Sequence, residues 1–261
     1  MRNLPRQNDL FAAIQAKDLW FYLAWQDIKL RYRRSKIGPL WITLSMSIFC
    51  VSLGVVYSQI FKAPINEYLP FLSTGFVCWG LISGLLGEAS NLFVDNAPYI
   101  KDIKTNLLTI LLRATVRQVI IFAHNFLIVI GIYLYFGISP NVAFLLVFPG
   151  IALVVFNLFA MGVTLSFIGS RFRDVAPITL SAIQIVFFIT PITWFPKLVS
   201  ADSWLVRANL FAHYIDLMRS PMLGRFPEAE SWWISMGSML VLGFLSMLIY
   251  INKSDRISFW V

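Results

Sequence analysis

The chain has 261 residues, of which 58% are hydrophobic and 13% are charged, whereas about a quarter of the residues in soluble domains carry charge. This composition excludes a soluble domain and indicates a protein that crosses a membrane several times. The net charge of +8 is concentrated on one side of the predicted spans. That distribution is typical of membrane orientation and contact with anionic lipid, and it argues against a nucleic-acid partner.

Residues 1–261 are expected to form a single transmembrane domain, because no linker divides them and the short loops leave no room for a soluble catalytic module. Cys50 and Cys78 fall in apolar segments without a paired spacing, so neither a disulfide nor a metal site is expected. The N-terminal residues are polar where a signal peptide needs an apolar core. No cleaved leader is therefore expected.

The first predicted element is an amphipathic helix over residues 9–34 that lies in the inner membrane interface. Its apolar residues alternate with Lys, Asp and Gln, and Trp20 and Trp25 suit the headgroup layer. The dense basic cluster at its end cannot enter hydrocarbon. Two interpretations explain this helix equally well. It is a simple topology anchor, or it is a surface that recognises a lipid phosphate or a partner subunit.

Uncharged segments predict six membrane-spanning helices, since about 20 apolar residues cross the hydrocarbon core. Four of them are single stretches of 20 to 25 uncharged residues. The longest stretch has 53 uncharged residues and is divided into two helices by Gly137 and the Ser139-Pro140 turn. The predicted spans are residues 37–61, 68–92, 107–137, 142–169, 175–196 and 231–252.

Six crossings place both termini on one side of the membrane, and the basic residues indicate which side that is. With the termini inside, 16 Lys and Arg residues lie in the inner segments and five in the outer ones. Because Lys and Arg collect in cytoplasmic loops, both termini of this multi-pass protein are expected in the cytoplasm.

Two short loops on the inner side are candidates for docking a partner. The loop after the second span, VDNAPYIKDIKT, mixes charges and is expected to begin a brief helix at Ala97-Pro98. The loop after the fourth span, residues 170–174, is a tight elbow with alternating charge and one exposed aromatic residue. Either loop alone is more typical of a positive-inside anchor, but two on the face of the basic N-terminal helix favour a cytoplasmic partner.

The outer segment, residues 197–230, carries balanced charges and a pattern of apolar residues that predicts a re-entrant helical hairpin between spans five and six. One apolar face of this hairpin is expected to lie in the outer leaflet, and Ser220-Pro221 marks its end. Such a hairpin can gate a pathway, although the burial of its apolar surface alone is enough to explain why the hairpin exists.

Ionisable residues are scarce inside the spans, and His124 in the third span is the clear candidate for a functional group there. A structural role, in which the neutral imidazole bonds to a neighbouring helix, explains His124 at least as well as a functional role, because no acidic partner completes a proton relay. The chain has no HExxH, GxSxG or paired-carboxylate motif, and it contains no Gly-Lys dipeptide, which excludes a P-loop. We therefore expect neither a catalytic nor a metal site, and any ATP must be bound by another chain.

Aromatic side chains are frequent in the first and fifth predicted spans. They are Trp41, Phe49, Tyr57, Phe187, Phe188, Trp194 and Phe195. Most membrane aromatics face lipid or pack in the core. If some of these face a shared pore, their flat apolar faces can stack on sugar rings and let a polymer slide.

Three motifs carry a family resemblance. They are RYRRSKIGPLW over residues 31–41, SRFRDVAPI over 170–178 and NLFAHYIDLMRSPMLG over 209–224. Together with six spans and both termini inside, they resemble the membrane subunit of bacterial O-antigen and capsular-polysaccharide ABC exporters. The resemblance covers essentially the whole chain, and the first motif is the most specific.

The resemblance implies a homodimer of this chain with two copies of a separate ATPase, which binds ATP and Mg. It implies the movement of an undecaprenyl-diphosphate-linked polysaccharide from the cytoplasm to the periplasm across the bacterial inner membrane. By itself this chain would then be no enzyme and would hold no cofactor, but would form the pore of an ATP-hydrolysing translocase.

The resemblance also implies roles for four groups of residues. The lipid diphosphate would enter at Arg31, Arg33, Arg34 and Lys36, where Arg side chains can make bidentate, charge-assisted hydrogen bonds. The ATPase would contact the N-terminal helix and Asp95, Asn96, Pro98, Tyr99, Lys101, Arg171, Phe172, Arg173 and Asp174. The glycan path would follow the aromatic residues of the first and fifth spans. The periplasmic gate would include Trp204, Asn209, Phe211, Tyr214 and Arg219.

Other functions remain open from the sequence. Within the exporter class, teichoic acid or a small amphiphile is an alternative substrate. A different class is an integral-membrane transferase acting on polyprenyl-linked sugars, which needs clustered acidic residues or His at one interface, and none is evident. A proton-coupled flippase is a third class, which the single His124 supports weakly.

Overall fold

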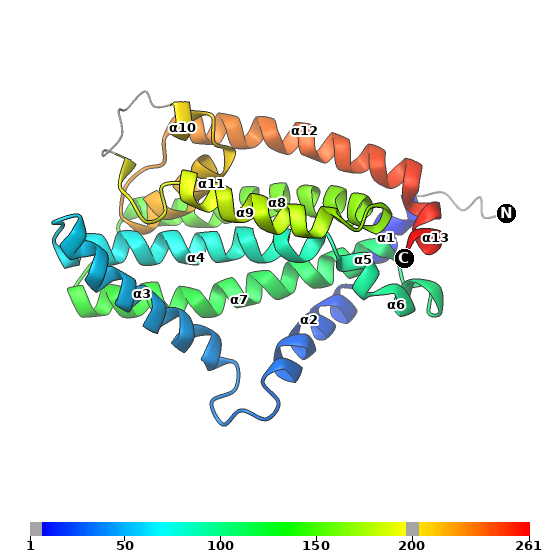
Figure 1. Ribbon diagram of the computed structural model, residues 1–261, viewed down its shortest axis with the longest axis horizontal. Coiled ribbons are helices and arrows are strands. Elements are labelled where there is room, and N and C mark those ends of the chain that lie inside the picture. Colours follow the sequence, from blue (N-terminus) through cyan, green and yellow to red (C-terminus); the bar gives the residue numbers. More distant parts are fainter. Residues whose placement is uncertain (1–6, 197–203) are drawn as a thin grey trace.

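The computed structural model describes residues 7–196 and 204–261, and all regular elements among these residues are helices, as the sequence predicts. Figure 1 shows the long helices running side by side along the length of the molecule. The first and last helices, α1 (Gln7–Gln15) and α13 (Ile257–Trp260), lie at one end of this bundle, called the terminal end below. Helix α11 (Leu210–Met222) lies toward the opposite end, called the α11 end.

The remaining helices follow in chain order. They are α2 (Lys17–Arg31), α3 (Leu40–Ile60), α4 (Ile65–Ala89), α5 (Leu92–Asp95), α6 (Ala97–Lys101), α7 (Leu107–Phe136), η1 (Val142–Leu146), α8 (Val147–Arg171), α9 (Val175–Ile189), α10 (Trp204–Arg207), α12 (Ala229–Lys253) and η3 (Ser254–Arg256). Among the described residues, five helical stretches are long and apolar enough to cross a membrane. They contain α3, α4, α7, α8 and α12, and each overlaps one of the predicted spans, although the last stretch extends to Trp260.

The N-terminal segment forms two helices, α1 and α2, where the sequence predicts one. The helical geometry is interrupted at Ala16 (φ −79°, ψ 24°). The Trp20 indole N–H donates to the Ala13 carbonyl at 3.0 Å. In a continuous helix this carbonyl would accept from the backbone N–H of Lys17. Helix α2 then buries Ala24 and Ile28 and packs on α7.

The fifth predicted span, residues 175–196, is helical over only the 15 residues of α9. At 1.5 Å per residue this helix is about 22 Å long, which is shorter than the hydrocarbon core of about 30 Å. The helix stops because Pro191 has no N–H to donate and disfavours helical geometry at Thr190, whose backbone is extended (φ −80°, ψ 136°). Thr190, Pro191 and Ile192 are buried, so protein surrounds this non-helical backbone.

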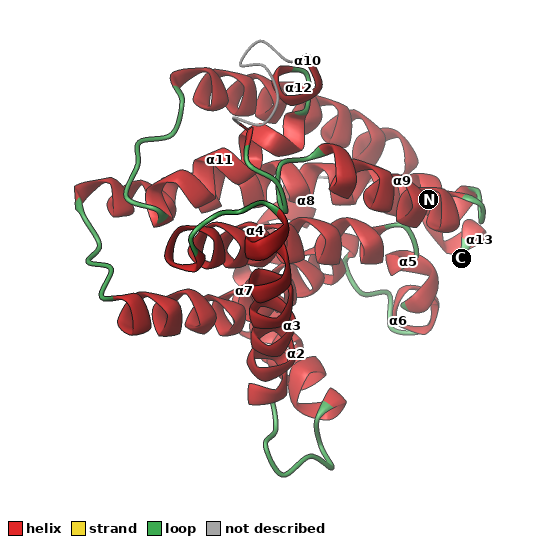
Figure 2. Ribbon diagram, turned by 60° about the vertical axis from the view of Figure 1, so that its left-hand side comes forward, coloured by secondary structure: helices red, strands yellow, loops and turns green. Residues whose placement is uncertain are grey.

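Helix α4 is the central helix of the bundle. In its most apolar window 83% of the residues are buried, against 11% in α3 and 17% in α12. It packs against α3, α7, α8, α9 and α11, whereas Figure 2 shows α2 and α3 projecting from the rest of the bundle. The apolar surfaces of α3 and α12 are therefore available to lipid or to another subunit.

Helix α8 approaches its neighbours closely at two glycines. A Cβ atom at Gly169 would lie 1.9 Å from the carbonyl oxygen of Ser90, and one at Gly150 would lie 2.5 Å from a carbonyl oxygen of α11. In the same helix, the Ser166 hydroxyl donates to the Ala89 carbonyl at 2.8 Å. Small residues thus let α8 contact the backbones of two neighbouring elements.

The outer segment contains two helices, α10 and α11, where the sequence predicts a re-entrant helical hairpin. Residues 197–203 of the predicted 197–230 segment lie outside the described residues. Helix α10 is a single turn, and α11 packs against α4, α8 and α12. Its polar His213 is buried as well, because the imidazole bonds to the Ser231 hydroxyl and the Arg207 carbonyl in place of water.

Candidate functional site

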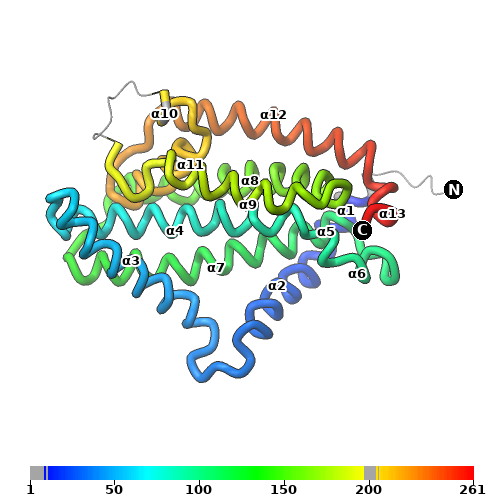
Figure 3. The backbone as a smooth tube through the Cα atoms, in the orientation of Figure 1, coloured from blue at the N-terminus to red at the C-terminus, as the bar shows by residue number. Residues whose placement is uncertain are grey.

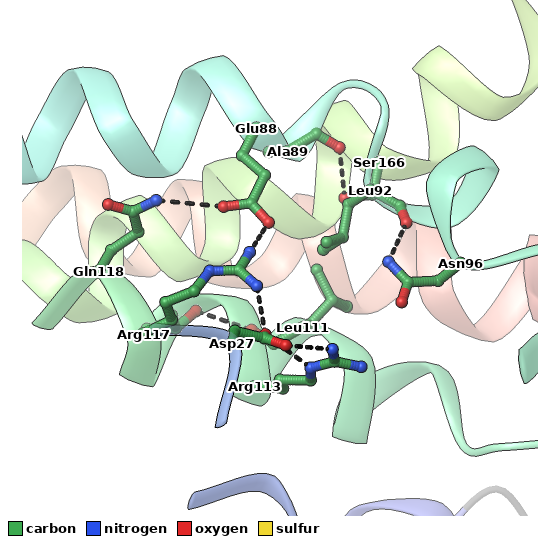
Figure 4. A network of polar contacts seen from close by, with 11 residues as sticks. Asp27, Glu88, Ala89, Leu92, Asn96, Leu111, Arg113, Arg117, Gln118 and Ser166 are labelled. Atoms are coloured by element: carbon green, nitrogen blue, oxygen red, sulfur yellow. Dashed lines mark hydrogen bonds and ion pairs between the residues drawn. The ribbon is translucent and has the colours of Figure 1, made fainter. Parts of the chain in front are cut away.

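A network of ion pairs joins three helices near the terminal end (Figure 4). The Arg113 guanidinium of α7 donates to both carboxylate oxygens of Asp27 in α2, at 2.9 and 2.5 Å. Bidentate, charge-assisted pairs of this kind are among the stronger polar contacts in proteins. Arg117, one turn further along α7, pairs with Asp27 and with Glu88 at the end of α4. Charge therefore holds α2, α4 and α7 together at this point.

The network is partly shielded from water, since its charged side chains are between 14% and 26% exposed. Such pairs are screened less than those on an open surface. The Gln118 amide adds a hydrogen bond to the Glu88 carboxylate at 3.1 Å. Sequence reasoning treats Arg113 and Arg117 only as inner basic residues. Their spacing of four residues, in a helix without other Lys, Arg, Asp or Glu, is the signal that marks them as a pair.

Helix α6 is linked to the same network. The Arg113 guanidinium carbon lies 5.7 Å from the centre of the Tyr99 ring, a cation–π arrangement. The Tyr99 side chain is 42% exposed, so it contacts both the network and the surroundings of the protein. A chain of contacts thus leads from the surface of α6 through Arg113 to α2.

The first inner loop consists of α5, α6 and the residues around them. Asp95 ends α5, and Pro98 and Lys101 belong to α6. The Asn96 amide donates to the Leu92 carbonyl at 2.8 Å, which fixes the turn between the two short helices. The brief helix predicted at Ala97-Pro98 is present as α6.

The second inner loop, between α8 and α9, is exposed along its length. Arg171, Phe172, Arg173 and Asp174 are all exposed, and the Phe172 side chain is 60% exposed. The Arg171 guanidinium carbon lies 5.6 Å from the centre of the Trp260 ring in α13, so this loop is also at the terminal end. Exposed apolar side chains on such a surface suit a contact with another protein.

The basic cluster lies in the loop between α2 and α3, at the turn that the tube in Figure 3 makes between these diverging helices. Arg31, Arg33, Arg34 and Lys36 are all exposed. The three arginines line a hollow of about 460 Å³. Gly38, with φ +62°, permits the turn into α3. Positive charge gathered in this way attracts anionic groups.

The aromatic residues predicted from the sequence fall into two clusters, each completed by residues of α4. In the first cluster, the Phe49 and Phe76 rings meet edge to face with centres 5.0 Å apart, and Phe76 lies 5.7 Å from Phe187. Phe187 also lies 5.4 Å from Phe188 and 5.7 Å from Trp79. Phe188 is 67% exposed, so this cluster reaches the surface of the subunit.

The second aromatic cluster lies toward the α11 end. Tyr57 and Phe61 have ring centres 5.9 Å apart, and Phe61 lies 5.8 Å from Tyr68. Phe195 then lies 5.6 Å from Tyr68 and 4.4 Å from Phe71. Sequence reasoning missed the contribution of α4, although its aromatic residues recur at helical spacing. They are Tyr68, Phe71, Phe76 and Trp79.

The two predicted tryptophans of the aromatic path take separate positions. Trp41 is exposed in the first turn of α3. The Trp194 indole N–H donates to the Phe188 carbonyl at 3.2 Å, so Trp194 closes the turn that follows α9.

A family model described as ABC-2 type transporter matches residues 18–223, from the start of α2 through α11. The chain belongs to the ABC-2 type transporter family. Two curated relatives from Klebsiella pneumoniae, both named O-antigen export system permease protein RfbA, are 24% and 25% identical to it over 201 residues. The matches cover 76% of this chain and 77% of each relative. The resemblance drawn from the three sequence motifs is confirmed, and the chain is a permease, the membrane subunit of an ABC transporter.

The predicted gate residues of the permease take different positions at the α11 end. Trp204 is 73% exposed in α10. Asn209 caps α11 by accepting a hydrogen bond from the Phe211 N–H at 3.0 Å, and its amide donates to Thr190 at the end of α9 at 2.8 Å. Tyr214 is fully buried, and its hydroxyl lies 3.0 Å from the Ser238 hydroxyl of α12, while the Phe211 ring centre lies 6.2 Å from that of Trp79 in α4. Three of these residues therefore tie α11 into the bundle.

Arg219, the last predicted gate residue, is only 6% exposed. Its guanidinium donates to the Pro191 carbonyl at 2.6 Å and lies 4.2 Å from the centre of the Phe71 ring. Burial lowers the pKa of Arg219 to about 10, so the side chain is still charged at neutral pH. Together with the Tyr68 hydroxyl, which donates to the Thr193 carbonyl at 2.5 Å, Arg219 satisfies the non-helical backbone after α9.

His124 takes part in contacts between helices of the permease. Its Nδ1 bonds to the Ile120 carbonyl at 2.8 Å, and its ring stacks on that of Trp25 in α2 with centres 6.3 Å apart. The Thr43 hydroxyl donates to the His124 carbonyl at 2.7 Å. The ring contacts of His124 thus join α7 to α2, and its backbone carbonyl joins α7 to α3.

Proposed function

We propose that the permease is the pore subunit of an ATP-driven exporter that moves an undecaprenyl-diphosphate-linked, O-antigen-like polysaccharide from the cytoplasm to the periplasm. In this proposal two copies of the chain work with two copies of a separate ATPase, which binds ATP and Mg, in the bacterial inner membrane. Both termini then face the cytoplasm. The family membership and the names of the two Klebsiella relatives support this proposal.

The arrangement of the terminal end carries the proposal. Two exposed inner loops lie there, and one of them is connected through Tyr99, Arg113 and Asp27 to the interface helix α2. Force applied at α6 by an ATPase would be transmitted through ion pairs, which hold their geometry better than loosely packed apolar side chains. Movement of α6 would then shift α2 and, through Arg117 and Glu88, the central helix α4.

The substrate side of the proposal rests on charge and apolar surface. The basic loop offers arginines to a diphosphate. An apolar cavity of about 420 Å³, lined by α4, α8, α9 and residues of α11 and α12, would accept a hydrocarbon chain. The same cavity would also suit a small amphiphile, which makes that substrate the second candidate.

Two copies of the chain would meet at the surfaces that are apolar and exposed in one copy. Helix α3 has such a surface, and Phe49 and Phe188 of the first aromatic cluster are both exposed. A path between two copies would therefore be lined by aromatic faces on both sides.

Export in cells tests the proposed substrate. Deletion of the gene should remove the surface polysaccharide and leave lipid-linked glycan in the cytoplasmic leaflet, whereas a deletion without effect on surface glycan contradicts the proposal. A chain with Arg31, Arg33 and Arg34 changed to Gln should insert normally and fail to restore export. The control changes Lys253 and Arg256 to Gln, because these exposed basic residues lie outside the loop.

Coupling to ATP hydrolysis is tested with the purified permease–ATPase complex. Arg173→Ala combined with Asp174→Ala should preserve ATPase activity and abolish its dependence on transport, because the docking loop loses both charges. Lys253→Ala combined with Asp255→Ala serves as the control at the same end of the bundle. Full coupling in the Arg173 and Asp174 variant would refute the assignment of this loop.

A further inference from the structure

Helix α13, the last helix of the described chain, lies beyond the membrane-crossing part of α12. The 25 residues of α12 make it about 37 Å long, which exceeds the hydrocarbon core of about 30 Å. Lys253 ends this helix, Asp255 and Arg256 follow it, and all three side chains are exposed. Three charges in so short a stretch are too costly to place in hydrocarbon. Helix α13 therefore lies outside the hydrocarbon, at the terminal end (Figure 1).

Helix α13 contacts both inner loops. Its Ile257 is only 1% exposed and belongs to the same apolar cluster as Phe93 of α5 and Ile100 of α6. Its Trp260 ring centre lies 5.6 Å from the Arg171 guanidinium carbon, and α13 packs against both α6 and α8. Through Ile257 and Trp260, α13 therefore joins the loop that contains α5 and α6 to the loop between α8 and α9.

Phe259, between these two anchoring residues, is not packed against the rest of the chain. Its side chain is 85% exposed, the highest value among the large apolar side chains that the structure describes. The two loops that α13 contacts carry further exposed aromatic side chains, Tyr99 and Phe172. Exposed apolar side chains that gather outside the hydrocarbon mark a surface for contact with another protein.

A protein surface suits Phe259 better than the lipid headgroup layer does. Aromatic residues in that layer are mostly Trp and Tyr, because an indole N–H or a phenol O–H reaches water while the ring stays in an apolar setting. The Phe side chain has no such polar atom. A protein that docks on both inner loops would also lie against α13, because α13 contacts both of them. The ATPase of the proposed function is such a protein.

We propose that α13 is a third part of the surface on which the ATPase docks, and that Phe259 enters an apolar pocket of the ATPase. The inference rests on the proposed function, because it needs the separate ATPase, and it adds a contact outside residues 18–223, which the family model matches. Ile257 and Trp260 hold α13 against the two loops, so that the three parts of the surface keep one arrangement. A single aromatic side chain in a pocket is a common anchor of protein interfaces.

The test measures how tightly the full-length permease in lipid nanodiscs binds the ATPase that purifies with the native chain. Phe259→Ser removes the ring and should weaken ATPase binding about tenfold, as is usual when an aromatic anchor is lost. Phe259→Leu keeps an apolar side chain and should weaken binding less. Phe226→Ser is the matched control, because Phe226 is 71% exposed and follows α11 at the opposite end of the bundle. All three variants should keep the native thermal midpoint, since the replaced side chains are exposed.

The possible outcomes separate the α13 contact from the proposed function. Weaker ATPase binding by Phe259→Ser, together with native binding by Phe226→Ser, supports the inference. Native affinity of the Phe259→Ser variant overturns it and leaves Phe259 to the headgroup layer or to solvent, and an equal loss in both Ser variants overturns it as well. In these two cases the ATPase still binds the native permease, so only the α13 contact fails. If no ATPase binds the native permease, the proposed function fails, and the inference falls with it.

Discussion

Asp27 accepts hydrogen bonds from two arginines of α7, and its side chain is only 15% exposed. Asp27→Asn keeps the size of the side chain but removes its charge, so Arg113 and Arg117 are left with Glu88 as the remaining carboxylate. We expect the free energy of unfolding to fall by about 2–3 kcal/mol, because a partly buried, charge-assisted pair is broken on one side. The thermal midpoint of the purified permease measures this loss.

The control for Asp27 is Asp18→Asn, since Asp18 lies on the same helix and is exposed. An exposed charge contributes little, and this variant should unfold close to the native midpoint. The double variant Asp27→Asn with Arg113→Gln should lose less than the sum of the two single losses, because the pair acts as a unit. Equal midpoints for the Asp27 and Asp18 variants would show that the network does not stabilise the fold.

At the scale of elements, the packing of α8 depends on how closely it approaches the backbone at Ser90. Gly169→Ala places a methyl group where the Ser90 carbonyl oxygen is 1.9 Å away, so α8 must move from the connection between α4 and α5. Overpacking of this kind costs about 1–3 kcal/mol, and we expect the thermal midpoint to fall. Gly131→Ala in α7 meets open space and should not lower the midpoint, since Ala is the better helix former. A Gly169→Ala chain as stable as the Gly131→Ala chain would contradict the close packing of α8.

The ends of elements are predictable where a local signal marks them. Helix α7 begins at its Asn106 cap, whose side chain accepts from the Leu108 N–H, and it ends at Gly137 with φ +67°. Both residues lie in the sequence at the predicted bounds. The end of α9 has no charge to mark it, and Pro191 interrupts a stretch that is otherwise apolar and uncharged. A prediction from hydropathy therefore places the end of this helix at residue 196, whereas the helix ends at Ile189, just before Pro191.

A candidate site can be predicted from the sequence only where its residues are neighbours in the sequence. The basic loop is visible in the sequence because its charges are neighbours. The partners Asp27 and Arg113 are 86 residues apart, and nothing in a single sequence indicates that they meet. Arg219 likewise contacts Phe71 and the Pro191 carbonyl, which come from other parts of the chain, so a single sequence does not indicate that these groups meet.

At the scale of the whole molecule, the two ends of the permease differ in chemistry. The terminal end has two exposed loops, and the α11 end has a cavity in which both signs of charge occur, whereas the basic loop between α2 and α3 lies between the two ends (Figure 1). In the proposed function the ATPase would dock at the terminal end, which would then face the cytoplasm, and this would give transport its direction. The orientation of the chain in the membrane is therefore the property on which the direction depends.

We expect a cysteine at position 35 to face the cytoplasm and one at position 139 to face the outside. Ser35 and Ser139 are both exposed, and α3, α4 and α7 lie between them in the chain, so three crossings would place them on opposite sides of the membrane. In intact spheroplasts a membrane-impermeant maleimide should react with Ser139→Cys, and it should react with Ser35→Cys only after lysis, because basic residues collect inside. The native chain is the control, since Cys50 and Cys78 are buried. Labelling of Ser35→Cys alone from outside would reverse the direction of the proposed transport, and labelling of both from outside would mean that α3, α4 and α7 do not all cross the membrane.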